Sequence, residues 1–329
     1  MDRICAVGLL SGGLDSALAA KLLIDQGIEV VGLHLQAPTA CRTQVDEVCA
    51  DLGIRLEVRQ KGPEYLKLLR NPRFGYGRNM NPCIDCRVFM FGMGRLFMDQ
   101  VGARFLFTGE VVGQRPMSQM RNTIQRIDKE SDLAGWVLRP LSAKLLPETE
   151  PERLGWVDRT HLLGISGRGR AEQLSLAASL GLKGYSSPGG GCLLTDENFS
   201  RKLRDLFDHV PEEKTDEASV RLLRIGRHFR IGPDVKIVLG RNYDENMALR
   251  GFLSGERHLV EPDGFHGPHA LICGPLRVEA VEETARLIAR YTRHLPTAAQ
   301  VRYRENGEER RFAIPAEEPA LVTIDAVRR

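Results

Sequence analysis

The chain lacks the long apolar runs, leader segment and even cysteine set of a membrane or secreted protein. No hydrophobic run approaches the roughly 18–20 residues needed to cross a bilayer, and the start MDRICAVG has no signal-peptide pattern. Seven cysteines are an odd number in 329 residues, so a disulfide framework is disfavoured and any close pair is better interpreted as metal or redox chemistry. We therefore expect a cytoplasmic protein without a membrane partner.

The chain also has little net charge. Its 46 Lys and Arg residues nearly balance 43 Asp and Glu residues, leaving +3. Composition is therefore weak evidence for a nucleic-acid partner, and an RNA-binding surface would need basic groups clustered on one face. We find no internal repeat and no low-complexity tract. With 42% hydrophobic residues, a chain of this length can bury a sizeable core and form about two domains.

The most informative feature is a glycine turn, SGGLDS at 11–16, between the apolar run Ile4–Leu10 and the helical pattern Ala17–Gln26. Two glycines let the backbone bend around an anion, and amides at the helix start point toward it. The alternative is a turn whose serine and aspartate only cap the helix. We favour a phosphate site, and the residues expected to bind ATP are Ser11, Gly12, Gly13, Asp15 and Ser16.

This turn has no lysine, which excludes a Walker loop. That loop needs Gly-x4-Gly-Lys-Ser/Thr, with the lysine serving the terminal phosphates. SGGLDS instead resembles the pyrophosphate loop (PP-loop) of the ATP pyrophosphatase superfamily, whose members adenylate a substrate by splitting ATP between the alpha and beta phosphates. The resemblance implies ATP with Mg²⁺ as cofactors, and AMP and pyrophosphate as products.

Short apolar strands alternate with helical patterns over the first 195 residues. This order predicts a parallel, Rossmann-like α/β sheet of the adenine nucleotide alpha hydrolase type. Ligands collect at the carboxyl ends of such strands, where SGGLDS and Thr108-Gly109-Glu110 would lie. The expected strands are Val30–Leu35, Arg55–Arg59, Phe105–Thr108 and Val137–Arg139, and the expected helices are Arg42–Leu52, Asp85–Val101 and Arg170–Leu180.

The pattern changes from about Glu212 onward. Paired strands surround Asn306-Gly307, a strong hairpin signal, and helices are expected near Asn242–Leu253 and Arg277–His294. The polar run 212–217 is the best linker in this region. We therefore predict a PP-loop domain over residues 1–210 and a second, smaller α+β domain, with RNA binding as its expected role, over residues 218–329.

Three cysteines form the second chemical feature. Cys83 and Cys86 lie three apart where a helix is expected to begin, and the positive end of a helix favours thiolates. Cys192 follows the glycine-rich SPGGG. Three thiols suit a 4Fe–4S cluster with one iron left without a protein ligand, or a persulfide carrier with a partner thiol. Unrelated reduced thiols are a third alternative. Of the others, Cys5, Cys49 and Cys273 are expected in the core and Cys41 is undecided.

Four separated motifs resemble one family. CIDCRVFMFGMG, FLFTGEVVGQRPMSQ, VLRPL and YSSPGGGC occur in the order typical of the tRNA 4-thiouridine synthetase catalytic domain, and the resemblance covers about residues 3–200. The chain is more loosely similar to the tRNA 2-thiouridylases, which share NPCxxC. The resemblance implies that a uridine carbonyl oxygen in tRNA is adenylated and then replaced by sulfur, which comes from sulfide or a cysteine-desulfurase-type donor.

The same resemblance assigns roles to particular residues. It makes Asp15 a catalytic residue together with Cys83, Cys86 and Cys192, the three candidate metal ligands. The residues expected to line the nucleotide or uridine pocket are Gly109, Gln114, Ser118 and Gln119. Of these, Gly109 and Gln114 are also expected to bind the cofactor. The family usually carries an N-terminal RNA-binding module, for which a first strand at residue 4 leaves no room. We therefore expect RNA recognition in the C-terminal part.

That part contains VLGRNYDEN at 238–246 and GPHALI at 267–272, which resemble the NFACT RNA-binding domain over about residues 220–295. The resemblance implies RNA contacts by Arg241, Asn242, Asn246 and His269. An ordinary helix entry with an asparagine cap would give the same GRN pattern.

Three hypotheses follow from the sequence. The leading one is an ATP-dependent tRNA sulfurtransferase. The alternatives are a non-catalytic, ATP-sensing RNA-binding factor, and a PP-loop enzyme that thiolates or ligates a small molecule.

Overall fold

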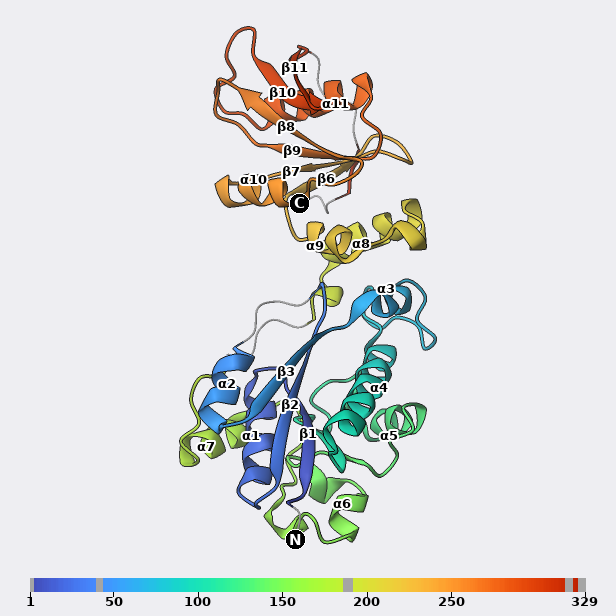
Figure 1. Cartoon of the computed structure of the whole chain (residues 1–329), viewed down its shortest axis with the longest axis vertical. Helices are drawn as coiled ribbons and strands as arrows, with labels where there is room; N and C mark the ends of the chain where they lie inside the picture. Colours follow the sequence, from blue (N-terminus) through green and yellow to red (C-terminus); the bar gives the residue numbers. More distant parts are fainter. Residues whose placement is uncertain (1–2, 40–43, 186–191, 317–321, 325–329) are drawn as a thin grey trace. The chain divides into compact units, whose positions relative to one another are not determined.

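The structure, a computed structural model, describes residues 3–39, 44–185, 192–316 and 322–324. The chain divides into two compact units, Met1–Leu193 and Leu194–Arg329 (Figure 1). The sequence placed the end of the first domain at residue 210, whereas residues 194–210 cluster with the second unit. No helix in the described ranges is long and apolar enough to span a membrane.

The first unit is built on a five-stranded sheet in which each neighbouring pair runs parallel. The strand order is β3-β2-β1-β4-β5, so the predicted Rossmann-like sheet is confirmed. The strands are β1 (Cys5–Leu9), β2 (Glu29–Gln36), β3 (Arg55–Gln60), β4 (Phe105–Thr108) and β5 (Val137–Leu138).

Both faces of this sheet are buried, which explains the near-continuous apolar strands. Ala6 and Phe107 belong to a core shared with α1, α2 and α7, while Val7 and Leu106 belong to the core under α4 and α5. Figure 1 shows α1, α2 and α7 on one side of the sheet and α4 and α5 on the other. The helices are α1 (Leu14–Ile24), α2 (Val45–Leu52), α3 (Gly62–Arg70), α4 (Cys83–Val101), α5 (Arg121–Glu130), α6 (Glu150–Arg153) and α7 (Ala171–Ser179), with 3₁₀ turns η1 (Ala143–Leu145), η2 (Arg159–His161) and η3 (Leu193–Thr195).

The second unit is built on a seven-stranded antiparallel sheet of order β11-β10-β8-β9-β7-β6-β12. The predicted Asn-Gly hairpin is confirmed, because Asn306 and Gly307 both have positive φ angles, 49° and 84°, between β10 and β11. The strands are β6 (Arg227–Arg230), β7 (Lys236–Leu239), β8 (Arg257–Asp263), β9 (Ala270–Cys273), β10 (Gln300–Glu305), β11 (Glu308–Ala313) and β12 (Val322–Thr323).

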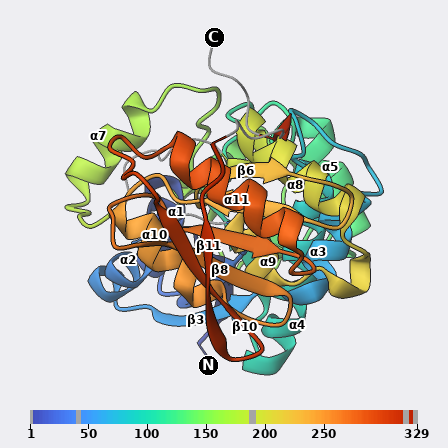
Figure 2. The same ribbon diagram turned by 90° about the horizontal axis from the view of Figure 1, so that it is seen from above.

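Helices cover both faces of this second sheet. Ile237 and Ile272 pack under α11, which lies against β7, β8, β9 and β11 (Figure 2). Val238 and Leu271 pack on the other face with Leu249. The predicted linker contains η4 and the start of α9. The helices are α8 (Glu197–His209), α9 (Glu217–Leu222), α10 (Tyr243–Leu249) and α11 (Val278–Arg290), with 3₁₀ turns η4 (Glu212–Lys214) and η5 (Arg250–Phe252).

Candidate functional site

The glycine turn lies at the point where the strand order of the first sheet reverses. The strands β1 and β4 are neighbours, but their chain connections run to opposite sides of the sheet. Parallel sheets bind ligands in the crevice outside the carboxyl ends of such strands. SGGLDS follows β1 and Gly109 follows β4, so the fold brings together the two segments that the sequence assigned to nucleotide binding.

The glycine turn at residues 11–16 (the anion turn) has the backbone shape expected of an anion-binding site. Gly12 has φ +74°, and a Cβ there would lie 2.7 Å from the backbone nitrogen of Val45. Ser16 donates its hydroxyl to the carbonyl of Gly13 at 2.8 Å. No side chain caps the first turn of α1, so the interpretation of the serine and aspartate as mere caps has no supporting contact. Within the turn, the amide of Ser11 donates to Oγ of Ser16 and the amide of Gly13 donates to Oγ of Ser11, both at 3.4 Å. The start of α1, which has no side-chain cap, is the part of the turn that suits an anion.

Gly109 packs directly against the start of α1. A Cβ at this position would lie 2.5 Å from the carbonyl carbon of Asp15 and from the backbone nitrogen of Ser16. Only glycine therefore allows the loop after β4 to reach the anion turn. Ser118 and Gln119, the other residues expected to line the pocket from this loop, are buried.

Asp15 is held from two sides. Gln114 donates from Nε2 to Asp15 Oδ2 at 3.0 Å, and Nη2 of Arg170 lies 3.5 Å from the same oxygen. The other oxygen, Oδ1, is buried and accepts no hydrogen bond from the described residues. A carboxylate oxygen of this kind suits Mg²⁺. Arg170 precedes α7 and was not among the sequence candidates.

The two cysteines of the CxxC motif differ in their surroundings. Lys61, which directly follows β3, places Nζ 3.3 Å from Sγ of Cys86. Burial raises the pKa of Cys86, but Lys61 and Arg87 outweigh it, and the pKa ends below its ordinary value. Burial, followed by Cys86, raises the pKa of Cys83. The sequence predicted thiolates at both cysteines, but of these two thiols only Cys86 has a lowered pKa, which favours its thiolate.

Cys192 influences the pKa values of two side chains, Tyr65 and Arg115, that Cys86 or Cys83 also influences. The pKa of Tyr65 is raised well above its ordinary value by burial and then by Cys86 and Cys192. The pKa of Arg115 is lowered by burial and then by Arg87, whereas Cys83 and Cys192 act in the opposite direction. Gln114 donates to Asp15 of the anion turn, and the next residue, Arg115, interacts electrostatically with Cys83 and Cys192. Two adjacent residues of one loop therefore link the thiols with the anion turn. Cys41 and residues 186–191 lie outside the described residues.

The thiols are nevertheless not assembled as a metal centre. Within the described ranges, which include the three candidate cysteines, no group of three His, Cys, Asp or Glu side chains could hold a metal ion. Cys83 and Cys86 are partly buried and Cys192 is exposed. As placed, these residues do not fit a 4Fe–4S cluster, which needs its ligands gathered around one group.

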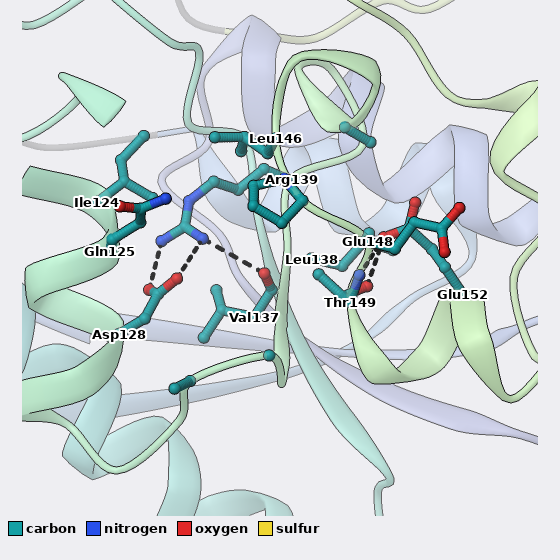
Figure 3. A pocket seen from close by; sticks show the side chains of 14 residues that line it. Ile124, Gln125, Asp128, Val137, Leu138, Arg139, Leu146, Glu148, Thr149 and Glu152 are labelled. Carbon is teal, nitrogen blue, oxygen red and sulfur yellow. Dashed lines mark hydrogen bonds and ion pairs between the residues drawn. The ribbon is translucent and has the colours of Figure 1, made fainter. Parts of the chain in front are cut away.

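A buried ion network supports this region. Glu110 is 3% exposed and lies 3.2 Å from Nε of Arg87 and 3.0 Å from Nε of Arg139. Burial raises the pKa of Glu110, but the two arginines outweigh it and the pKa is lowered. Arg139 also pairs with Asp128 at 2.7 Å (Figure 3). Arg87, Glu110 and Arg139 lie within the sequence motifs that carry the resemblance, which gave them no role, and Asp128 lies outside these motifs.

A pocket of about 150 Å³ lies beside Arg139 (Figure 3). It is lined by α5, β5 and the segment from Ala143 to Glu152, and none of its lining residues is a sequence candidate. The guanidinium of Arg139 is already occupied by Asp128 and by the carbonyl of Val137. We therefore assign the pocket no part in the site.

The RNA candidates of the second unit have structural contacts. Asn242 caps α10 by accepting from the amide of Glu245 at 2.9 Å. Asn246 accepts from the amide of His269 at 3.0 Å. Arg241 pairs with Glu245, yet about half of its side chain is exposed. The asparagines thus shape the loop, and Arg241 is the candidate most open to a ligand.

These features define a parallel α/β unit with a glycine turn at its switch point, followed by an antiparallel-sheet unit. Residues 4–144 match the family model described as thiamine biosynthesis protein (ThiI), and residues 226–320 match the model described as NFACT protein RNA binding domain. The two resemblances inferred from the motifs are therefore confirmed.

Relatives and a solved structure match parts of the chain. It is 27% identical over 134 residues to a tRNA-specific 2-thiouridylase MnmA of Helicobacter hepaticus, covering 38% of this chain and 39% of the relative. It is 29% identical over 238 residues to the tRNA-specific 2-thiouridylase MnmA of Pseudomonas fluorescens, a match that covers 67% of this chain and 59% of the relative. A structure titled as a 4-thiouridine synthetase–RNA complex with bound ATP aligns with TM-score 0.39 and 22% identity, covering 54% of this chain and 40% of that one. The chain spans less than two thirds of the length of each.

Proposed function

We propose that this protein is an ATP-dependent tRNA sulfurtransferase that adenylates a uridine carbonyl oxygen and replaces it with sulfur, releasing pyrophosphate and then AMP. One observation carries the proposal: a single loop places Gly109 against the anion turn, Gln114 on Asp15, and Arg115 in the field of Cys83 and Cys192. These contacts support a proposal in which nucleotide and sulfur chemistry take place at one site. We expect it to work in the cytoplasm.

Each step of the proposed reaction can be assigned to particular residues. The backbone of the turn and the first amides of α1 would bind the phosphates, and Asp15 would hold Mg²⁺. A carbonyl oxygen is a poor leaving group until it carries AMP. The outer sulfur of a persulfide is a strong nucleophile near neutral pH, so its attack follows adenylation and releases AMP. The S–S link that then joins the uridine to the protein would be broken by a partner thiol, which releases the thiouridine.

For the sulfur step, the geometry supports a cysteine-carried sulfur better than a 4Fe–4S cluster. Cys86 has a cationic partner, and the three thiols are not gathered around a common point. Protein prepared without oxygen and analysed for iron and acid-labile sulfide decides between the two. Fewer than one iron per chain, with thiolation intact, would support the persulfide; about four irons per chain would support the cluster.

We assign tRNA binding to the second unit. Its match to an RNA-binding domain supports this, as does the exposure of Arg241. Arg241→Ala should weaken tRNA binding and reduce the slope of log affinity against log salt by about one. Lys129→Ala, at an exposed position of the first unit, is the control. An unchanged slope for Arg241→Ala would remove this residue from the interface.

The deciding experiment supplies the full chain with ATP, Mg²⁺, unmodified tRNA and glutathione persulfide as the sulfur donor, with glutathione as the thiol reductant. We expect AMP, pyrophosphate and thiouridine, and mass spectrometry of the digested tRNA identifies the modified uridine and the carbon that carries sulfur. Asp15→Asn should reduce AMP formation at least about a hundredfold, whereas Asp25→Asn, an exposed residue of the same helix region, should not. ATP binding without AMP formation would instead favour the ATP-sensing RNA-binding factor. AMP formation that requires a small acceptor rather than tRNA would favour the small-molecule enzyme.

A further inference from the structure

Lys61 is a buried cation with an unusual partner. Its side chain lies at the carboxyl end of β3, on the same edge of the sheet as the anion turn, and the residue is 7% exposed. A buried ammonium is costly unless a strong acceptor compensates it. Among the described residues no carboxylate lies within ion-pair distance of Lys61. Lys61 donates instead to Sγ of Cys86, which lies 3.3 Å from Nζ.

Tyr65 fixes Lys61 in this place. The ammonium lies 4.3 Å from the centre of the Tyr65 ring, a cation–π distance, and Tyr65 is itself 2% exposed. Its hydroxyl lies 3.7 Å from the same Sγ. The ammonium of Lys61 at the N-terminus of α3 and the hydroxyl of Tyr65 in α3 thus meet at one sulfur of α4.

We propose that Lys61 is a positioning residue that holds Sγ of Cys86 as the sulfur-accepting nucleophile of this protein, and that the incoming sulfur is the sulfane sulfur of a donor persulfide. This inference rests on the proposed sulfur transfer. It adds a residue that no motif contains, and it assigns the acceptor role to Cys86 rather than to Cys83 or Cys192.

The loading step balances without an outside oxidant. Sγ of Cys86, as thiolate, attacks the outer sulfur of the donor R–S–SH. A new S–S bond forms while the S–S bond of the donor breaks, and its electron pair leaves on the donor thiolate R–S⁻. The proton stays on the transferred sulfur, which gives a Cys86 persulfide. Lys61 keeps Sγ in the line of attack and stays in contact with the sulfur.

The test measures loading directly. The full chain is incubated with glutathione persulfide, and tandem mass spectrometry locates the added sulfur. We expect it on Cys86, still present in Cys83→Ala and absent in Cys86→Ala. Lys61→Gln, which keeps the length and packing of the side chain, should lower the initial loading rate at least about tenfold. Lys61→Arg, which keeps a cation, should recover part of that loss.

Lys67→Gln is the matched control. This lysine lies on α3 as well, but it is half exposed and pairs with Glu64. It should load at the wild-type rate. A change of melting temperature alone, without a change in loading, would reduce Lys61 to a structural role and overturn the inference, as would loading of Cys83 or Cys192 in preference to Cys86.

Failure of this inference can be told apart from failure of the proposed function. If Lys61→Gln still thiolates tRNA and loads sulfur at wild-type rates, the inference is wrong and the function stands. If Cys86 loads in a Lys61-dependent manner but tRNA is never thiolated, the inference stands and the proposed function is wrong.

Discussion

Nε of Arg87 lies 3.2 Å from Oε1 of Glu110, and this ion pair fastens the helix that carries the two cysteines to the loop that carries Gly109. Glu110 also accepts from Arg139, which follows β5, so three segments distant in sequence meet at one carboxylate. The helix that carries Cys83 and Cys86 and the loop that carries Gly109 are therefore held together by a buried charge. Its loss should affect stability and activity together.

Glu110→Gln tests this arrangement. The substitution leaves two arginines facing a neutral amide in a buried place, which should cost about 3–5 kcal/mol of unfolding free energy. The chain has two tryptophans, Trp136 and Trp156, both in the first unit, so urea unfolding followed by fluorescence reports on that unit.

Glu64→Gln is the control for this measurement. Glu64 is exposed and pairs with Lys67, so its loss should stay within about 1 kcal/mol. A loss for Glu110→Gln no larger than that of the control would show that the network contributes little to holding the site.

Gly109→Ala should separate nucleotide binding from the rest of the fold. The added methyl group would meet the backbone of Asp15 and Ser16 at 2.5 Å, and a backbone cannot move aside as a flexible side chain can. We expect ATP affinity, measured by calorimetry, to fall at least about tenfold. Gly92→Ala in α4 is the control, because nothing lies within 4 Å of its added methyl. It should leave ATP affinity unchanged and raise stability by about 0.5–1 kcal/mol.

Much of the first unit could be predicted because its signals are local. The apolar strands, the glycine turn and the CxxC motif at a helix start each lie within a few consecutive residues, and the parallel sheet then places their ends at one edge. Lys61 and Arg170 carry no such signal. Lys61 meets Cys86 from 25 positions away, and Arg170 meets Asp15 only after the chain has returned to the sheet edge.

The second unit could be predicted less completely. The hairpin around Asn306 was evident because its turn needs positive φ angles, which Asn and Gly tolerate. The strands β6, β7, β8 and β9 were not predicted; in β6 and β8, arginines, histidines and Pro262 interrupt the apolar pattern. Pairing with neighbouring strands and packing under α11 decide their structure, and neither can be read from a short window.

His228 should make the second unit lose stability in mild acid. This residue is fully buried, and its pKa lies well below the ordinary value because of burial first, then Lys236 and Lys202. The unfolded chain takes up a proton at an ordinary pKa of about 6.5, and the folded chain does not. The stabilisation is therefore complete above pH 6.5 and is lost as the pH falls toward the native pKa, by about 1 kcal/mol between pH 6.5 and 5.5.

Comparison of the wild type with His228→Gln isolates this contribution. Unfolding followed by circular dichroism at several pH values should give a shallower pH dependence for the variant, even if its stability is lower at every pH. His294→Gln, at an exposed position, should keep the wild-type slope. Equal slopes in all three proteins would contradict the assignment to His228.

Asn242 distinguishes a structural from an RNA-binding reading of the GRN pattern. Its Oδ1 accepts from the amide of Glu245 at the start of α10, so Asn242→Ala should cost about 1 kcal/mol of unfolding free energy. Asn242→Ser keeps a capping oxygen and should restore most of that loss. If the cap is its main role, tRNA affinity at fixed salt follows stability, with the serine variant close to wild type. A serine variant that is stable yet binds tRNA at least about tenfold more weakly would assign the amide of Asn242 a direct contact with RNA.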